Sequence, residues 1–168
     1  MTRDFTPAAF GRILDALEAR HYRMVPVREW ARGAADGVAV IRHDVDRRPG
    51  NALALATLEA ARGIRASYYF RTVPIAFDAG IIREIAAMGH EVGYHYEDLS
   101  AANGVPEAAV RSFAANLARF APLAEVKTVV MHGAPLSRHS NLDLWKFATL
   151  EEFGLDAEAA LTDYSRCT

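Results

Sequence analysis

Hydrophobic positions along the chain follow two periods, one typical of amphipathic helices and the other of short buried strands. In the first predicted helix they form an i, i+3, i+4 stripe, and Thr6 with Pro7 supplies an N-cap and a first helical residue. Pro49 and Gly63 mark the start and the end of a second helix. The pattern predicts helices over residues 6–20, 51–62, 78–88 and 106–120, a helical turn over 27–31 and a largely helical segment over 141–153.

Short apolar runs between these helices are typical of buried strands. The most distinct run begins after a turn signal at Asp36-Gly37 and continues into Arg42-His43-Asp44-Val45-Asp46. Strands are expected over residues 22–26, 38–46, 66–70, 91–95, 126–131 and 159–161. Strands that alternate with helices predict an α/β fold with a parallel sheet, here as one domain over residues 1–168, with sites at the carboxyl ends of the strands.

Composition and charge restrict the class of protein. Hydrophobic residues make up 51% of the chain and charged residues 24%, and the formal charge of -2 argues against nucleic acid or an anionic membrane as a partner. Residues 1–5 are not followed by an apolar signal core, and no stretch is long enough to span a bilayer. The single Cys167 cannot form an internal disulfide. We therefore expect a soluble, cytoplasmic protein.

Two carboxylates at the end of one strand are the first candidate for chemistry. Side chains alternate along a strand, so Asp44 and Asp46 should fall on one side, about 6–7 Å apart. One could bind a divalent cation while the other takes a proton; a solvated acidic turn is the alternative. Unpaired carboxylates after an apolar strand are costly without a cation or hydrogen bonds, which favours a site.

The other predicted strands also end in polar residues: Arg71, His95 followed by Glu97 and Asp98, and His132 followed by Gly133. Asp46, His95 and His132 come from three separate strand ends and should converge. Nitrogen and carboxylate ligands suit zinc or a related divalent metal. The sequence therefore predicts a metal site at this edge of the sheet.

Residues around this edge are candidates for contact with a small-molecule substrate. Arg42 or Arg47 could steady the carboxylates, and Glu97 lies next to the strand that carries His95. Gly133 begins a loop that could bring backbone close to a substrate. His139, in the same loop, is either a substrate contact or a solvated residue, and His90 is expected to have only a turn or capping role.

Two segments of the chain resemble motifs of the polysaccharide deacetylase family, also known as the NodB homology group or carbohydrate esterase family 4. Arg42-His43-Asp44-Val45-Asp46 resembles the family's apolar strand ending in D-x-D. Gly89-His90-Glu91-Val92-Gly93-Tyr94-His95 matches its G-H-E-[IV]-G-x-H element. The resemblance covers roughly residues 38–135. It implies a deformed (β/α) barrel with Asp44 as catalytic base and with Asp46 and His95 as metal ligands.

The chain departs from the family pattern at three places. Leu99 stands where the family has a second metal-binding histidine, and residues 131–135 replace its Arg-Pro motif. A compensating ligand is therefore expected, with His132 as first choice and Glu97 as second. The family's last motif, which supplies a histidine as general acid, has no counterpart. The acid is expected to be His139 if His132 binds metal. Five or six strands in 168 residues are fewer than a closed (β/α) barrel of about 200–250 residues has, so the barrel is expected to be partial or open.

The function expected from these residues and from the resemblance is that of a metal-dependent hydrolase, with zinc as the first choice of metal. It would remove acetyl groups from an acetylated carbohydrate or cleave a related non-peptide carbon–nitrogen bond. A non-catalytic binding or structural module with the same fold is the first alternative. The second treats His43-Asp44 as the metal-binding pair of an HD-type phosphohydrolase, although that pair normally lies on a helix in an all-α fold.

Overall fold

A computed structural model describes residues 6–34 and 37–164 of the protein. The expectations for residues 1–5, Asp36 and Cys167 lie outside this part of the chain. Among the helices of the described residues, none combines the length and the apolar character needed to cross a bilayer.

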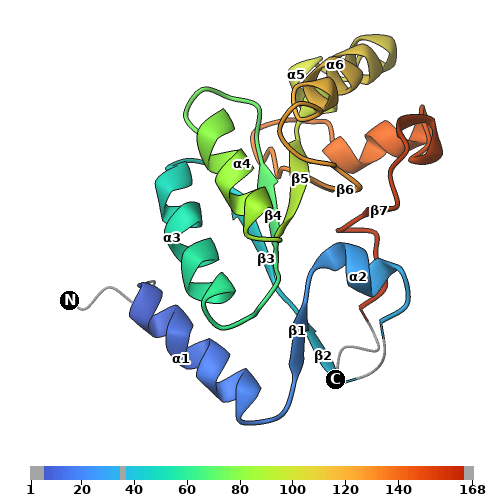
Figure 1. The fold of residues 1–168 in the computed structure, drawn as a ribbon. Helices are drawn as coiled ribbons and strands as arrows, with labels where there is room; N and C mark the ends of the chain where they lie inside the picture. Colours follow the sequence, from blue (N-terminus) through green and yellow to red (C-terminus); the bar gives the residue numbers. More distant parts are fainter. Residues whose placement is uncertain (1–5, 35–36, 165–168) are drawn as a thin grey trace.

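The strands form two parallel sheets, which confirms the predicted α/β class (Figure 1). The two-stranded sheet consists of β1 (Arg23–Val25) and β2 (Val38–Val40). The five-stranded sheet has its strands in chain order: β3 (Arg42–Val45), β4 (Ser67–Phe70), β5 (Glu91–Tyr96), β6 (Thr128–Met131) and β7 (Ala157–Glu158). Within the described residues no pairing joins β7 to β3, so these strands form an open sheet.

Five of the α-helices begin and end close to the residues that the sequence indicated, and the short helix over 98–101 was not predicted. The helices are α1 (Pro7–Glu18), α2 (Val27–Ala31), α3 (Pro49–Ala60), α4 (Ala79–Ala87), α5 (Asp98–Ala101) and α6 (Pro106–Ala118), followed by two 3₁₀ helices, η1 (Asn141–Lys146) and η2 (Glu151–Phe153). The Thr6 hydroxyl accepts a hydrogen bond from the Ala9 N–H at 3.1 Å, as expected of an N-cap. Gly63 follows α3 with a φ of 73°, a conformation that favours glycine.

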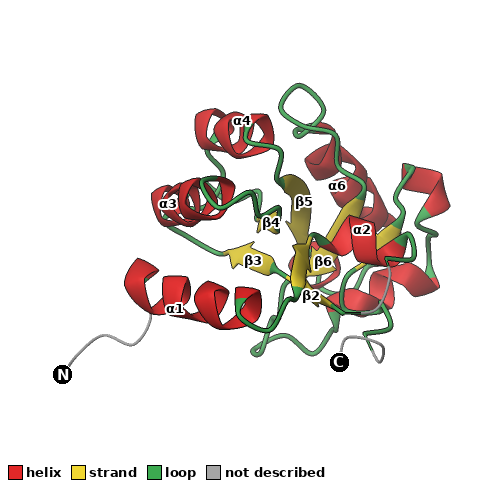
Figure 2. Ribbon diagram, turned by 60° about the horizontal axis from the view of Figure 1, so that its bottom comes forward, coloured by secondary structure: helices red, strands yellow, loops and turns green. Residues whose placement is uncertain are grey.

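One face of the five-stranded sheet is covered by α3, α4 and α6, which lie around the row of strands (Figure 2). Alternate strand residues point toward these helices because side chains of a strand point to opposite faces. The contact joins helix residues Ala52, Ala56, Ile82, Ile85, Ala109 and Phe113 to strand residues Tyr68, Phe70, Val92, Tyr94 and Val129. This face forms the larger hydrophobic core.

The opposite face of the sheet holds a smaller core that includes Val27 of α2, Tyr69, Val130 and Ala159. The Tyr69 ring passes over Gly93, and its hydroxyl pairs with the Thr128 hydroxyl at 2.7 Å. The start of α2 is fixed to the sheet because the Ser67 hydroxyl accepts from the Val27 N–H at 2.8 Å. This face also carries the polar residues at the carboxyl ends of the strands.

Three predicted elements differ from the structure. The strand expected over 38–46 is divided at Ile41, whose N–H bonds to Val25 of β1 while its carbonyl accepts from Ser67 of β4. The segment over 141–153 forms two short 3₁₀ helices, and the Asn141 side chain at its start bonds to the Ser100 N–H and to the His132 carbonyl. The last strand lies at 157–158, two residues before the expected 159–161.

Candidate metal centre

The register of the parallel strands places the candidate residues on one face of the sheet. Asp44 pairs with Tyr69, Tyr69 with Gly93, and His95 with Val130. Asp46 and His132 each lie two residues beyond a residue of this face, just past the ends of β3 and β6. They therefore meet at the carboxyl edge, on the side away from α3, α4 and α6.

Asp46, His95 and His132 form a compact group of potential metal ligands. Asp46 Oδ1 lies 3.4 Å from His95 Nε2 and 3.4 Å from His132 Nε2. One ligand atom from each of the three residues lies within 4.8 Å of the others. The two imidazole rings meet edge to face, with centroids 5.0 Å apart. The structure thus brings together the three residues that the sequence predicted as ligands.

The surroundings of His95 determine which of its nitrogens faces Asp46. The Val130 carbonyl lies 3.1 Å from His95 Nδ1, and a carbonyl oxygen can only accept, so the proton is on Nδ1. Burial lowers the pKa of His95, whose side chain is 4% exposed, and favours the neutral ring. Nε2 of the neutral ring therefore points a lone pair at Asp46 Oδ1.

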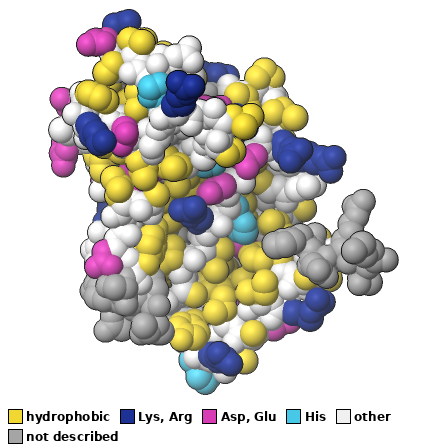
Figure 3. Space-filling view, turned by 180° about the vertical axis from the view of Figure 1, so that it is seen from behind, with side chains coloured by type: hydrophobic (Ala, Val, Ile, Leu, Met, Phe, Trp, Pro, Cys, Tyr) yellow, Lys and Arg dark blue, Asp and Glu magenta, His cyan; other side chains and the backbone are white. Residues whose placement is uncertain are grey.

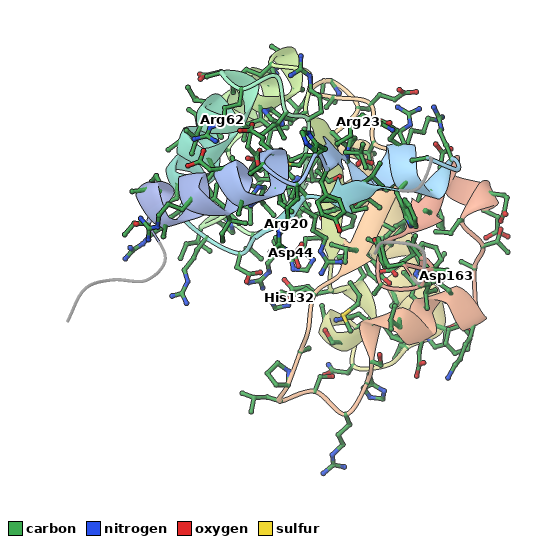
Figure 4. The ribbon with its side chains drawn as sticks, turned by 90° about the horizontal axis from the view of Figure 1, so that it is seen from below. Arg20, Arg23, Asp44, Arg62, His132 and Asp163 are labelled. Atoms are coloured by element: carbon green, nitrogen blue, oxygen red, sulfur yellow. The ribbon has the colours of Figure 1, made fainter. Side chains whose placement is uncertain are left out.

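His132 approaches the group from the end of β6. Its backbone N–H donates to the Tyr96 carbonyl at 2.7 Å, which extends the pairing with β5. Nε2 faces Asp46, and Nδ1 lies 3.3 Å from Glu97 Oε2. Figure 4 shows the His132 side chain close to that of Asp44.

The donor set of this group fits a divalent cation. A carboxylate oxygen and the lone pair of a neutral imidazole both accept, so their convergence is repulsive unless a cation or an added proton lies between them. Metal-binding histidines are commonly oriented by a hydrogen bond from their other ring nitrogen, as His95 Nδ1 here donates to a backbone carbonyl. The described residues can therefore hold a metal ion at this edge of the sheet.

Asp44 lies on the same face as these ligands. Its carboxylate is 30% exposed, and Oδ2 accepts a hydrogen bond from Arg42 Nη2 at 3.1 Å. Its negative charge is close enough to favour the protonated form of His95. His43 points to the opposite face, where Nε2 lies 2.8 Å from Glu59 Oε1 of α3. A metal site built from His43 and Asp44 together is therefore wrong.

The other predicted site residues have different surroundings. Glu97 binds Arg71 through both carboxylate oxygens, at 2.6 and 2.8 Å from Nη2. Gly133 has no positive φ, and a Cβ added to it would meet no heavy atom within 4 Å, so its backbone conformation does not require glycine. The exposed His139 lies against Gly104, where its Cε1 would be 2.3 Å from an added Cβ.

The loop that carries His139 borders an open pocket of about 440 Å³. Glu97 forms part of its wall, together with Ser100 and Asn103. Because Glu97 also lies beside His132, this pocket adjoins the Asp46–His95–His132 group. His139 therefore faces a space next to the candidate ligands rather than the ligands themselves.

Two contributions to the site had no assigned role in the sequence. They are the Val130 carbonyl, which orients His95, and Arg71, which binds Glu97. Arg71 was recognisable as a charged residue at the end of a predicted strand. A backbone carbonyl leaves no trace in the residue pattern, so the role of Val130 could be found only from strand register.

From behind, the surface shows histidine, acidic and basic side chains next to one another near its middle, bordered by hydrophobic side chains (Figure 3). Comparison of the chain with protein-family models, with curated proteins and with solved structures found no match.

Proposed function

We propose that this protein is a metal-dependent hydrolase of the polysaccharide deacetylase type, with zinc held by Asp46, His95 and His132. The observation that carries the proposal is the spacing of the three acceptors. Two atoms bound tetrahedrally at about 2.0–2.1 Å from zinc lie about 3.3–3.4 Å apart. Both measured distances from Asp46 Oδ1 to the imidazole nitrogens are 3.4 Å.

Different residues of the chain have different roles in the proposed reaction. A bound metal supplies Lewis-acid polarisation of an acyl carbonyl and lowers the pKa of water. Asp44 acts as the general base; Arg42 holds its Oδ2, so Oδ1 accepts the proton from the attacking water. His95 donates from Nδ1 to the Val130 carbonyl, so its Nε2 lone pair is available to the metal. His139, at the adjoining pocket, is the candidate acid for the leaving group.

The proposed substrate is an acetylated carbohydrate or a related compound with a non-peptide carbon–nitrogen bond. This choice rests on the resemblance of the D-x-D and G-H-E-V-G-x-H segments to the family's motifs. The fold supports the same family. Consecutive parallel strands with α3, α4 and α6 on one face are what part of a (β/α) barrel requires. The other face, which would be the barrel interior, carries Tyr69 and Val130.

Metal analysis of the purified protein tests the proposal. We expect about one equivalent of zinc in the wild type, and at least tenfold weaker binding in Asp46→Ala and in His95→Ala. Asp46 is half exposed, so its replacement should leave the fold intact. His21→Asn, at an exposed histidine with a φ of 60°, is the control and should retain the metal. Full metal retention in both site variants would end the proposal.

A non-catalytic module is the second candidate, and one observation favours it. Leu99, which replaces the family's second histidine, is 3% exposed and packs in the larger core, so it supplies no ligand. Hydrolysis of acetylated model sugars separates the two candidates. Activity that a chelator abolishes and zinc restores supports the enzyme; stoichiometric zinc without hydrolysis supports the module.

A further inference from the structure

His132 Nδ1 is a buried nitrogen that makes no hydrogen bond of good geometry to the described residues. Its nearest charged neighbour is Glu97 Oε2, at 3.3 Å. A small rotation of either side chain would bring this pair to the 2.7–2.9 Å typical of a charge-assisted hydrogen bond. Because an ionised carboxylate can only accept, the proton in such a bond belongs to Nδ1.

Arg71 fixes the carboxylate of Glu97 in front of this nitrogen. Arg71 Nη2 donates to Oε1 at 2.6 Å and to Oε2 at 2.8 Å, and Nε lies 3.2 Å from Oε1. The two side chains are 20% and 26% exposed, so solvent screens the pair only in part. A bidentate guanidinium contact restricts the orientation of the carboxylate as well as its position.

We propose that the Arg71–Glu97 pair is a positioning device, which keeps the proton of His132 on Nδ1 and directs the Nε2 lone pair toward the metal. The inference rests on the proposed function for its use, and it gives Glu97 a different role from the metal ligand or substrate contact expected from the sequence. Arg71, Glu97 and His132 come from the ends of β4, β5 and β6, so three neighbouring strands determine this tautomer.

The two histidines of the site are held by different acceptors. The Val130 carbonyl orients His95 as part of the sheet and cannot be removed by a side-chain change. His132 lies just past β6 and depends on a side chain for the same purpose. Replacement of Glu97 should therefore change the tautomer of His132 and leave that of His95 unchanged.

The tautomer of His132 can be measured on the metal-free protein by nitrogen-15 NMR of the imidazole rings. We expect the Nδ1–H form in the wild type. In Glu97→Ala we expect the Nε2–H form, because Asp46 Oδ1 at 3.4 Å is then the nearest carboxylate acceptor. His95 should keep its Nδ1–H form in both. Glu125→Ala, which removes an exposed carboxylate paired with Arg28, is the control and should leave both histidines unchanged.

Zinc titration against a competing chelator measures how the Glu97 variants change the affinity for zinc. We expect Glu97→Ala to weaken zinc binding about 10- to 100-fold at unchanged stoichiometry, and Glu97→Gln to weaken it less because its amide oxygen still accepts from Nδ1. Complete loss of stoichiometric zinc in Glu97→Ala, as in Asp46→Ala, would make Glu97 a ligand and overturn the positioning role.

The tautomer measurement keeps this inference separate from the proposed function. A wild type that binds no zinc refutes the metal-dependent hydrolase, while the NMR result still decides the role of Glu97. An unchanged His132 tautomer in Glu97→Ala, in a protein with wild-type circular dichroism, overturns the inference whether or not the wild type binds zinc.

Discussion

Gly93 is a residue whose small size the packing of the sheet requires. A Cβ added there would lie 2.3 Å from the Tyr69 ring and 2.7 Å from the Thr128 carbonyl oxygen. Because Tyr69 is fully buried, its ring cannot move aside without loss of packing. We expect Gly93→Ala to lower the free energy of unfolding by about 2–3 kcal/mol, measured by urea denaturation.

Gly133→Ala is the matched control for this prediction. A Cβ at Gly133 meets open space, so the change in unfolding free energy should stay within about 0.5 kcal/mol. Equal stability of the two alanine variants would show that the Tyr69–Gly93 contact is not tight. At the residue scale, the sequence could not assign this constraint, because only the strand register shows that the Tyr69 ring lies over Gly93.

At the scale of elements, one aromatic ring of α6 contacts both the sheet and the 3₁₀ segment. Phe113 is fully buried, with ring centroids 5.4 Å from Tyr94, 5.5 Å from Tyr96 and 4.8 Å from Phe153. We expect Phe113→Ala to cost about 3–5 kcal/mol of unfolding free energy, because the neighbouring rings cannot close the cavity. Thermal or urea unfolding followed by near-UV circular dichroism measures the loss.

Phe147→Ala serves as the comparison. Phe147 is 52% exposed, so its replacement should lower the free energy of unfolding by about 1 kcal/mol or less. If the two variants lost equal stability, Phe113 would not connect these elements. The helical pattern around Phe113 was readable from the sequence. Its contact with Phe153 was not, because the expected helix over 141–153 is two separate 3₁₀ pieces.

At the scale of the whole molecule, buried histidines link folding to pH. His90 is 5% exposed; Nε2 donates to the Ala56 carbonyl at 3.0 Å, and Nδ1 accepts from the Ala66 N–H at 3.2 Å. Burial lowers the pKa of His90, an effect partly opposed by the bond to Ala56 and by nearby Glu59 and supported by Arg65 and His43.

The direction of the pH effect follows from this shift. The unfolded chain takes up a proton at about pH 6.5 and the folded His90 only at lower pH, so stability is full above 6.5 and falls as pH decreases. One such histidine contributes a slope of at most about 1.4 kcal/mol per pH unit. The free energy of unfolding can be measured by urea denaturation at several values from pH 7.5 to 5. It should fall less steeply with decreasing pH in His90→Gln than in the wild type, and as steeply as in the wild type in His21→Asn. Equal slopes in all three proteins would contradict the assignment.

The parallel α/β class and the convergence of Asp46, His95 and His132 were predictable because the carboxyl ends of parallel strands share one edge. The division of the first long strand at Ile41 was not, since an apolar run does not reveal that its pairing partner changes from β1 to β4. Likewise, Glu97 was assigned as a ligand or a substrate contact because only register brings it beside Arg71.

The identity of strand order and chain order in the five-stranded sheet has a consequence for biosynthesis. As the chain leaves the ribosome, each strand from β4 to β7 finds its partner already synthesised, so the sheet can grow by local additions. Asp46, His95 and His132 emerge in the same order. The nascent protein therefore passes through a stage with two of its candidate ligands in place, and the third joins them only when β6 has been added.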